Sequence, residues 1–119
     1  MVNLDTHILV FALMGEVSDK ERRVLASNTW SLSAIVLWEL AKLAQLGRID
    51  IDLDDAEITR TLSSIHVWPI DLAVSIQSTR LDFKSDPADE LIAATSIVHQ
   101  IPLLTRDRRM RGSRLVKFA

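Results

Sequence analysis

Residues 2–5 read Val-Asn-Leu-Asp, and residues 103–107 read Leu-Leu-Thr-Arg-Asp. Both segments are short apolar runs that lead into an aspartate, which is typical of buried strands. Runs of this kind alternate along the chain with segments of helical periodicity. This alternation is the pattern of an α/β protein built on a mostly parallel sheet.

The remaining elements follow from the same reading of the sequence. Strands are predicted at 2–5, 29–32, 66–70 and 103–105, with 115–116 as a candidate fifth strand. Helices are predicted from 6 to about 14, from 18 or 19 to about 27, and over 34–46, 54–64, 72–81 and 87–100. There is no internal repeat, low-complexity tract or linker. Residues 1–119 are therefore expected to form a single domain around a sheet of four to five strands.

The composition excludes several classes of protein. The 119 residues are 48% hydrophobic and 25% charged, which is ordinary for a globular chain. The chain has no cysteine, so a disulfide scaffold, a thiolate metal site and a cysteine nucleophile are all ruled out. Its three glycines are scattered singly, and neither a P-loop nor a dinucleotide-binding fingerprint can be written.

Charge is distributed unevenly along the chain. Of its 14 basic and 16 acidic residues, six basic and one acidic residue lie in 106–119, although the net charge of the whole is only −2. A basic segment on an acidic body suggests a polyanionic partner. Solubilising charge on a terminal loop explains the same segment equally well.

The predicted helix over 34–46 is unusually apolar. Ten of its thirteen residues are apolar, and Glu39 interrupts the run between Trp38 and Leu40. We expect this helix to be buried on most sides and to take part in a homodimer interface. A buried carboxylate is costly unless it is paired or bound to a cation, although Glu39 could also pair with Lys42 on the helix surface.

Four carboxylates stand at positions where they could converge. Asp5 ends the first strand, Asp107 follows the strand at 103–105 after one residue, Glu39 lies in the apolar helix, and Asp89 lies in the first turn of the helix at 87–100. Ligands of open parallel sheets collect at the carboxyl ends of strands. Carboxylates about 4 Å apart repel by on the order of 1–4 kcal/mol per pair, and this repulsion favours a hard divalent cation such as Mg²⁺ or Mn²⁺. Helix capping is the alternative explanation for Asp89, and more strongly for Asp86.

Four segments together resemble the PIN-domain family, and within it the toxin ribonucleases of bacterial toxin–antitoxin systems (the virulence-associated protein C, or VapC, type). They are Leu-Asp-Thr-His at 4–7, Leu-Ser-Ala-Ile-Val-Leu-Trp-Glu-Leu-Ala at 32–41, Asp-Pro-Ala-Asp-Glu-Leu-Ile-Ala-Ala-Thr at 86–95 and Leu-Leu-Thr-Arg-Asp at 103–107. Each segment is modestly specific, but their order and their span of nearly the whole chain are strongly specific together.

The resemblance implies a three-layer α/β/α sandwich and a Mg²⁺- or Mn²⁺-dependent endoribonuclease with a cognate antitoxin. The family's catalytic and metal-binding acids carry over to Asp5, Glu39, Asp89 and Asp107, with Asp86 as a weaker candidate ligand. Thr6 and Thr105 match hydroxyl positions that would orient these acids through hydrogen bonds. Glu90 departs from the family pattern, in which arginine or alanine is commoner, and is expected to point away from the site.

Arginines next to the last acid are candidates for holding RNA. Arg106, Arg108 and Arg109 flank Asp107 and could bind phosphate near the metal. Without cysteine, export signal or apolar segment long enough to cross a membrane, the chain is expected to be cytoplasmic. Two other functions stay open from the sequence: a Mg²⁺-dependent phosphohydrolase or phosphotransfer protein with Asp5 as nucleophile, and a non-catalytic binding module whose acids serve as caps and ion pairs.

Overall fold

A computed structural model describes all residues from 1 to 119. Its four strands form one parallel sheet in the order β3–β2–β1–β4. Asn3 is in register with Ser31 on one side and with Leu103 on the other, which places β1 in the interior of the sheet. The strands are β1 (Val2–Leu4), β2 (Trp30–Ser33), β3 (His66–Trp68) and β4 (Leu103–Leu104).

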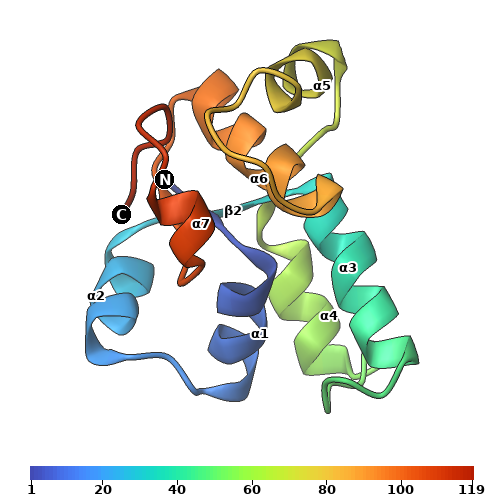
Figure 1. Ribbon diagram of the computed structural model, residues 1–119. Coiled ribbons are helices and arrows are strands. Elements are labelled where there is room, and N and C mark those ends of the chain that lie inside the picture. Colours follow the sequence, from blue (N-terminus) through green and yellow to red (C-terminus); the bar gives the residue numbers. More distant parts are fainter.

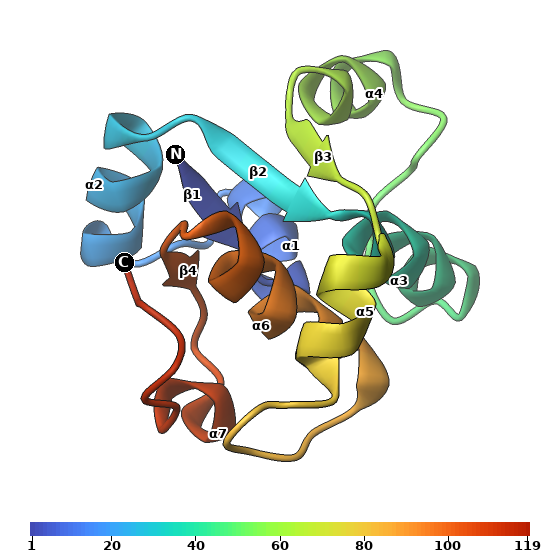
Figure 2. The same cartoon turned by 90° about the horizontal axis from the view of Figure 1, so that it is seen from above.

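Seven helices connect and cover the strands: α1 (Thr6–Met14), α2 (Asp19–Ser27), α3 (Ala34–Gln45), α4 (Ala56–Ser63), α5 (Leu72–Ser78), α6 (Pro87–His99) and α7 (Arg108–Arg111). Figure 1 shows α5 and α6 on one face of the sheet and α1 to α4 on the other, and Figure 2 shows the strands between these two layers. The predicted three-layer α/β/α sandwich with a parallel sheet is confirmed.

The strand order fixes where the chain changes direction. The chain crosses from β1 to β2 and on to β3 on one face, and then from β3 back to β4 on the other. Parallel crossovers are nearly always right-handed, so a reversal of strand order moves the connecting helices to the opposite face. The reversal places a topological switch point between β1 and β4, at the ends where Asp5 and Thr105 follow the strands.

Apolar residues from all layers close around the sheet. Val2, Leu4, Leu32 and Leu103 are fully buried on three of the four strands, and Met110 anchors the short helix α7 in the same core. Strands buried on both faces need apolar side chains at nearly every position, which explains why the strand segments read as short apolar runs.

The structure corrects three predictions of detail. Residues 115–116 form no strand; the sheet is extended only by an isolated bridge between Leu103 and Phe118. Helix α7 was not foreseen, because a four-residue helix has too little periodicity to be seen in a sequence. Helix α3 buries only Val36 and Leu40, so the expectation that it is covered on most sides within one chain is wrong.

None of the helices has both the length and the apolar composition needed to cross a bilayer.

Candidate active site

Asp5 lies at the topological switch point and is held there from two sides. Its Oδ1 accepts a hydrogen bond of 2.7 Å from the backbone N–H of Thr6, because Asp5 is the N-cap of α1. Its Oδ2 accepts a hydrogen bond of 2.6 Å from the hydroxyl of Thr105, which follows β4. Asp5 is only 3% exposed. The carboxylate is therefore fixed in orientation by one donor at the end of β1 and one at the end of β4.

Glu39 reaches the same region from α3. Its Oε1 accepts a hydrogen bond of 2.5 Å from the hydroxyl of Thr6. Thr6 thus gives its backbone N–H to Asp5 and its side chain to Glu39. Both threonines named in the sequence analysis bind acids in the structure, and these contacts link β1, α3 and β4.

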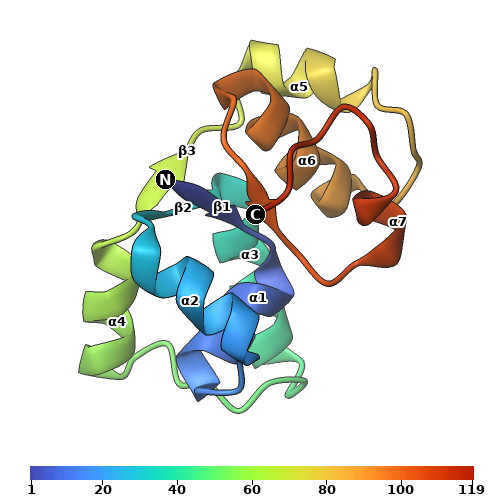
Figure 3. The same cartoon turned by 90° about the vertical axis from the view of Figure 1, so that its left-hand side faces the viewer.

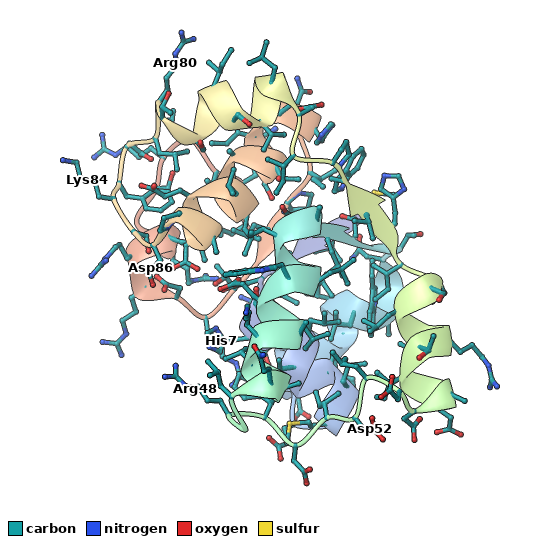
Figure 4. The ribbon with its side chains drawn as sticks, turned by 90° about the vertical axis from the view of Figure 1, so that its right-hand side faces the viewer. His7, Arg48, Asp52, Arg80, Lys84 and Asp86 are labelled. Carbon is teal, nitrogen blue, oxygen red and sulfur yellow. The ribbon has the colours of Figure 1, made fainter.

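Asp89 and Asp86 lie at the start of α6. The hydroxyl of Ser85 donates a hydrogen bond of 2.8 Å to Oδ2 of Asp89. Asp86 occupies the N-cap position, but its side chain makes no capping hydrogen bond. The capping hydrogen bond that was the alternative explanation for Asp86 is therefore missing, and its carboxylate is exposed. Figure 4 shows Asp86 and His7 on the same side of the molecule.

Asp107 is the N-cap of α7. Its Oδ1 accepts a hydrogen bond of 3.0 Å from the backbone N–H of Met110, and its own N–H donates to the hydroxyl oxygen of Thr105 at 3.0 Å. Thr105 is therefore bonded to two of the four acids. Asp107 therefore caps α7 through Oδ1, and its Oδ2 accepts no hydrogen bond inside the protein.

Burial and mutual repulsion raise the pKa of three of these acids. For Asp5, Glu39 and Asp89, removal of the carboxylate from water is the main cause, and hydrogen bonds from Thr105, Thr6 and Ser85 oppose it. The charge of Asp89 further raises the pKa of Asp5 and of Glu39, while Asp107 and Asp86 raise that of Asp89. The acids, which come from four separate elements, therefore interact electrostatically with one another.

His7 is a member of this site that the sequence analysis did not select. It acts on Asp5, Glu39 and Asp89 in the opposite sense to the neighbouring acids, lowering the pKa of each. Its position directly after Asp5 and Thr6 was the signal that could have found it. A lone exposed histidine in a first helical turn, however, has no ligand spacing to mark it.

The acids are coupled without meeting at a single point. No three side chains of Asp, Glu, His or Cys come close enough together to enclose a metal ion. The reason is local, because Asp89 is turned to Ser85 and Asp107 to the first turn of α7. The chemistry of the set nevertheless fits a hard divalent cation: all donors are carboxylate oxygens, and three of them carry the raised pKa that a nearby positive charge would relieve.

The three candidate arginines take different places. The guanidinium of Arg106 binds both carboxylate oxygens of Glu21 at 2.7 Å and lies 4.0 Å from the centre of the Phe11 ring. Arg109 makes only a long contact of 3.5 Å with the carbonyl of Lys84, and Arg108 makes no ion pair. All three arginines are exposed, but Arg106 is bound to Glu21 on α2, whereas Arg108 and Arg109 have no ion-pair partner.

The sequence model of the PIN domain family matches residues 2–113. The chain belongs to this family. It is 36% identical over 88 residues to Ribonuclease VapC22 of Mycobacterium tuberculosis (strain ATCC 25618 / H37Rv), and the match covers 71% of this chain and 67% of that protein.

Solved structures show the same fold at lower identity. A toxin–antitoxin complex from Klebsiella pneumoniae has a TM-score of 0.76 at 21% identity, covering 98% of this chain and 95% of that one. VapBC2 from Rickettsia felis, solved with a promoter DNA fragment, has a TM-score of 0.73 at 20% identity over 100% and 98%. FitAcB from Neisseria gonorrhoeae has a TM-score of 0.70 at 23% identity over 100% and 97%. The PIN-domain resemblance seen in the sequence is confirmed.

The Arg106–Glu21 pair, which ties the β4–α7 segment to α2, makes a testable contribution to stability. Arg106 and the backbone of Ser18 hold the pKa of Glu21 at about 2, below its usual 4.5. Glu21→Gln keeps the capping geometry of α2 but removes the charge. We expect it to lower the free energy of unfolding at pH 7 by about 1 kcal/mol, because Arg106 is 43% exposed and the pair is partly screened.

The pH dependence follows from the direction of this shift. A lowered pKa stabilises the folded protein above the usual value, and the contribution is lost as the pH falls from about 4.5 toward 2. Urea unfolding of both proteins at pH 7, 4.5 and 2.5 measures the difference. A gap between them that stays the same at pH 2.5 would contradict the assignment.

Proposed function

We propose that this protein is a metal-dependent endoribonuclease and the toxin of a type II toxin–antitoxin pair. The observation that carries the proposal is the set of mutually repelling carboxylates at the switch point of a PIN domain: buried Asp5 and half-buried Glu39 and Asp89, with Asp107 beside them. The relative at 36% identity is named a ribonuclease, and the solved relatives include toxin–antitoxin complexes.

Asp5, Glu39, Asp89 and Asp107 are the residues that would hold one or two divalent ions, Mg²⁺ or Mn²⁺, with Asp86 as a further exposed carboxylate. When bound, such ions activate water and stabilise the leaving oxygen of a phosphodiester. Their own positive charge would also relieve the repulsion that raises the pKa of the acids. The four acids supply oxygen donors only, which suits these ions rather than softer ones.

Other residues of the site act on the acids and on the RNA. Thr105 and Thr6 fix the orientation of Asp5 and Glu39, so that few conformations are lost when a ligand binds. Arg108 and Arg109 lie next to Asp107 without strong partners, and they are placed to bind backbone phosphates near the acids. Contacts of this kind position an RNA without reading its sequence.

The two alternative functions fit the geometry less well. A nucleophilic Asp5 would need an oxygen that a substrate phosphorus can approach in line, but Asp5 is only 3% exposed. A binding module whose acids are only caps and ion pairs does not account for Glu39 and Asp89, which cap no helix through a side-chain hydrogen bond and have no ion-pair partner.

Apolar surfaces support the two protein partners in the proposal. A cavity of about 410 Å³ between α3 and α4 is lined by six apolar side chains, among them Leu37, Leu53 and Leu62. It suits an apolar segment of an antitoxin. Outside it, Trp38 on α3 and Leu72 and Ile76 on α5 are exposed. Both helices pack against α6, and this face suits a second copy of the chain.

Removal of one central carboxylate tests the activity. Asp5→Asn keeps the size of the side chain and an acceptor for the Thr6 N–H, so the fold should remain. We expect cleavage of single-stranded RNA in Mg²⁺ or Mn²⁺ to fall by more than about a hundredfold. Asp52→Asn, an exposed aspartate that Figure 4 shows far from Asp86, is the matched control. Equal activity of the two variants would rule out the assignment.

The repulsion among the acids predicts an effect of metal on stability. In EDTA, Asp89→Asn should raise the free energy of unfolding by about 1 kcal/mol, or the melting temperature by about 3–5 °C, because it removes a charge that the fold disfavours. Millimolar Mg²⁺ or Mn²⁺ should raise the melting temperature of the unchanged protein more than that of the variant. Scanning fluorimetry with Asp52→Asn as control measures both effects. A metal response that is the same in all three proteins would count against the site.

The exposed apolar face of α3 and α5 predicts self-association. Trp38 is 57% and Leu72 75% exposed in the single chain. We expect the protein to be a dimer by light scattering at micromolar concentration, and Trp38→Glu with Leu72→Glu to make it a monomer. Leu115→Glu, which changes a similarly exposed leucine elsewhere, should leave the dimer intact. Scattering that shows only monomer for the unchanged chain would disprove this part of the proposal.

A further inference from the structure

A basic cavity lies beside the candidate active site, between α2 and the segment that links β4 to α7. It has a volume of about 340 Å³, and nine residues line it. Four are cations, one from α2 and three from the β4–α7 region: Lys20, Arg106, Arg108 and Arg111. Figure 3 shows α2 and α7 with the chain from β4 running between them. We call this space the α2–α7 basic cavity.

Internal contacts hold two of the four cations in place. Glu21 binds the guanidinium of Arg106 through both carboxylate oxygens. Arg111 donates a hydrogen bond of 3.3 Å to the carbonyl of Thr105 and lies 5.4 Å from the centre of the Phe118 ring. Arginine fixed in this way loses little freedom when it binds an anion. The walls of the cavity are therefore organised before any ligand arrives.

The cavity keeps an excess of positive charge. Glu21 is the only acidic side chain in its lining, and that carboxylate is already bound to Arg106. Lys20 and Arg108 form no ion pair and are exposed. Only two of the nine lining residues are hydrophobic, so the cavity does not suit an apolar protein segment. Its chemistry fits a phosphate or another compact anion.

Thr105 connects the cavity to the acids. Thr105 is part of the cavity lining, and its hydroxyl donates a hydrogen bond to Asp5 and accepts one from the N–H of Asp107. Asp107 itself stands in the chain between two of the cavity's arginines, Arg106 and Arg108. One extended polyanion can therefore touch both places at once, with one phosphate at the acids and another in the cavity.

We propose that the α2–α7 basic cavity binds a backbone phosphate of the RNA, outside the bond that is cleaved. This inference rests on the proposed ribonuclease function for the identity of its ligand. It adds Lys20 and Arg111 to the residues that contact RNA. It also assigns Arg106, with Glu21, the task of shaping the cavity rather than that of binding RNA in the open.

Binding measurements on a non-cleaving protein test the cavity directly. In an Asp5→Asn background, Lys20→Gln with Arg108→Gln removes the two cations of the cavity that no internal contact holds in place, and neither change disturbs a buried residue. We expect the Kd for a fluorescent single-stranded RNA to rise roughly fivefold near 0.1 M salt, and the slope of log K against log salt to fall by about 0.7, since this is the contribution of one lost phosphate contact to a single strand. Arg80→Gln, which changes an exposed arginine outside the cavity lining that Figure 4 shows at the edge of the molecule, is the control and should change neither value.

Neutral linkages in the RNA then locate the phosphate. RNAs that carry a single methylphosphonate at successive positions are bound to the protein with and without the two glutamine substitutions. At one position other than the cleaved bond, loss of the charge should weaken binding to the unsubstituted cavity and have no effect once Lys20 and Arg108 are neutral. The proposal is overturned if the effect of the methylphosphonate is the same with and without the two substitutions at every position. It is also overturned if the substitutions leave the slope of log K against log salt unchanged.

The outcome for the cavity is separable from that for the activity. Suppose that the unchanged protein cleaves RNA, but that no methylphosphonate position depends on Lys20 and Arg108. The cavity inference then fails and the ribonuclease function stands. If the coupling is found but no RNA is cleaved in any metal, the proposed function fails while the phosphate site stands. Loss of affinity for a protein partner alone, with RNA binding unchanged, would make the cavity a protein contact and would also overturn the proposal.

Discussion

The hydrogen bond from the Thr105 hydroxyl to Asp5 joins residues that are 100 positions apart in the sequence. It joins the ends of the neighbouring strands β1 and β4, where the order of the strands reverses. Thr6 extends the link to Glu39 on α3, and the N–H of Asp107 extends it to α7. The hydroxyls of Thr105 and Thr6 therefore contact every acid of the site except the two at the start of α6. Thr105 contacts Asp5 and Asp107, and Thr6 contacts Glu39. The positions of these acids depend on the register of β1 with β4 rather than on any loop.

The parts of the site that follow from strand ends could be predicted from the sequence. Asp5 and Asp107 stand after short apolar runs, and the rule that ligands gather at a switch point is enough to place them. Glu39 was found because it interrupts an apolar helix. Each of these signals is local: a strand, a helix or a charge inside an apolar run can be read within about ten residues.

The features that could not be predicted all depend on contacts between distant elements. Periodicity shows that α3 is apolar but not how many of its sides are covered, so the exposure of Leu37 and Trp38 was missed. The contact of Arg106 with Glu21 spans 85 positions, and no local sequence pattern near either residue predicts it. Asp86 has the sequence of a helix cap but makes no capping hydrogen bond, since cap geometry is decided by side-chain rotamers.

The arginines of the basic segment differ in their partners, and for this reason the number of basic residues is a poor measure of how strongly the segment binds an anion. Arg106 is the arginine closest in sequence to Asp5's partner Thr105, yet its charge is already neutralised by Glu21 and its plane rests on Phe11. An anion that displaced Glu21 would have to break two short hydrogen bonds and leave a carboxylate that is only 11% exposed without its partner. The cations without ion-pair partners gain an anion at no such cost. The binding strength of the basic segment therefore resides in the residues that the fold leaves without a partner, and the paired arginine contributes by holding the segment in place.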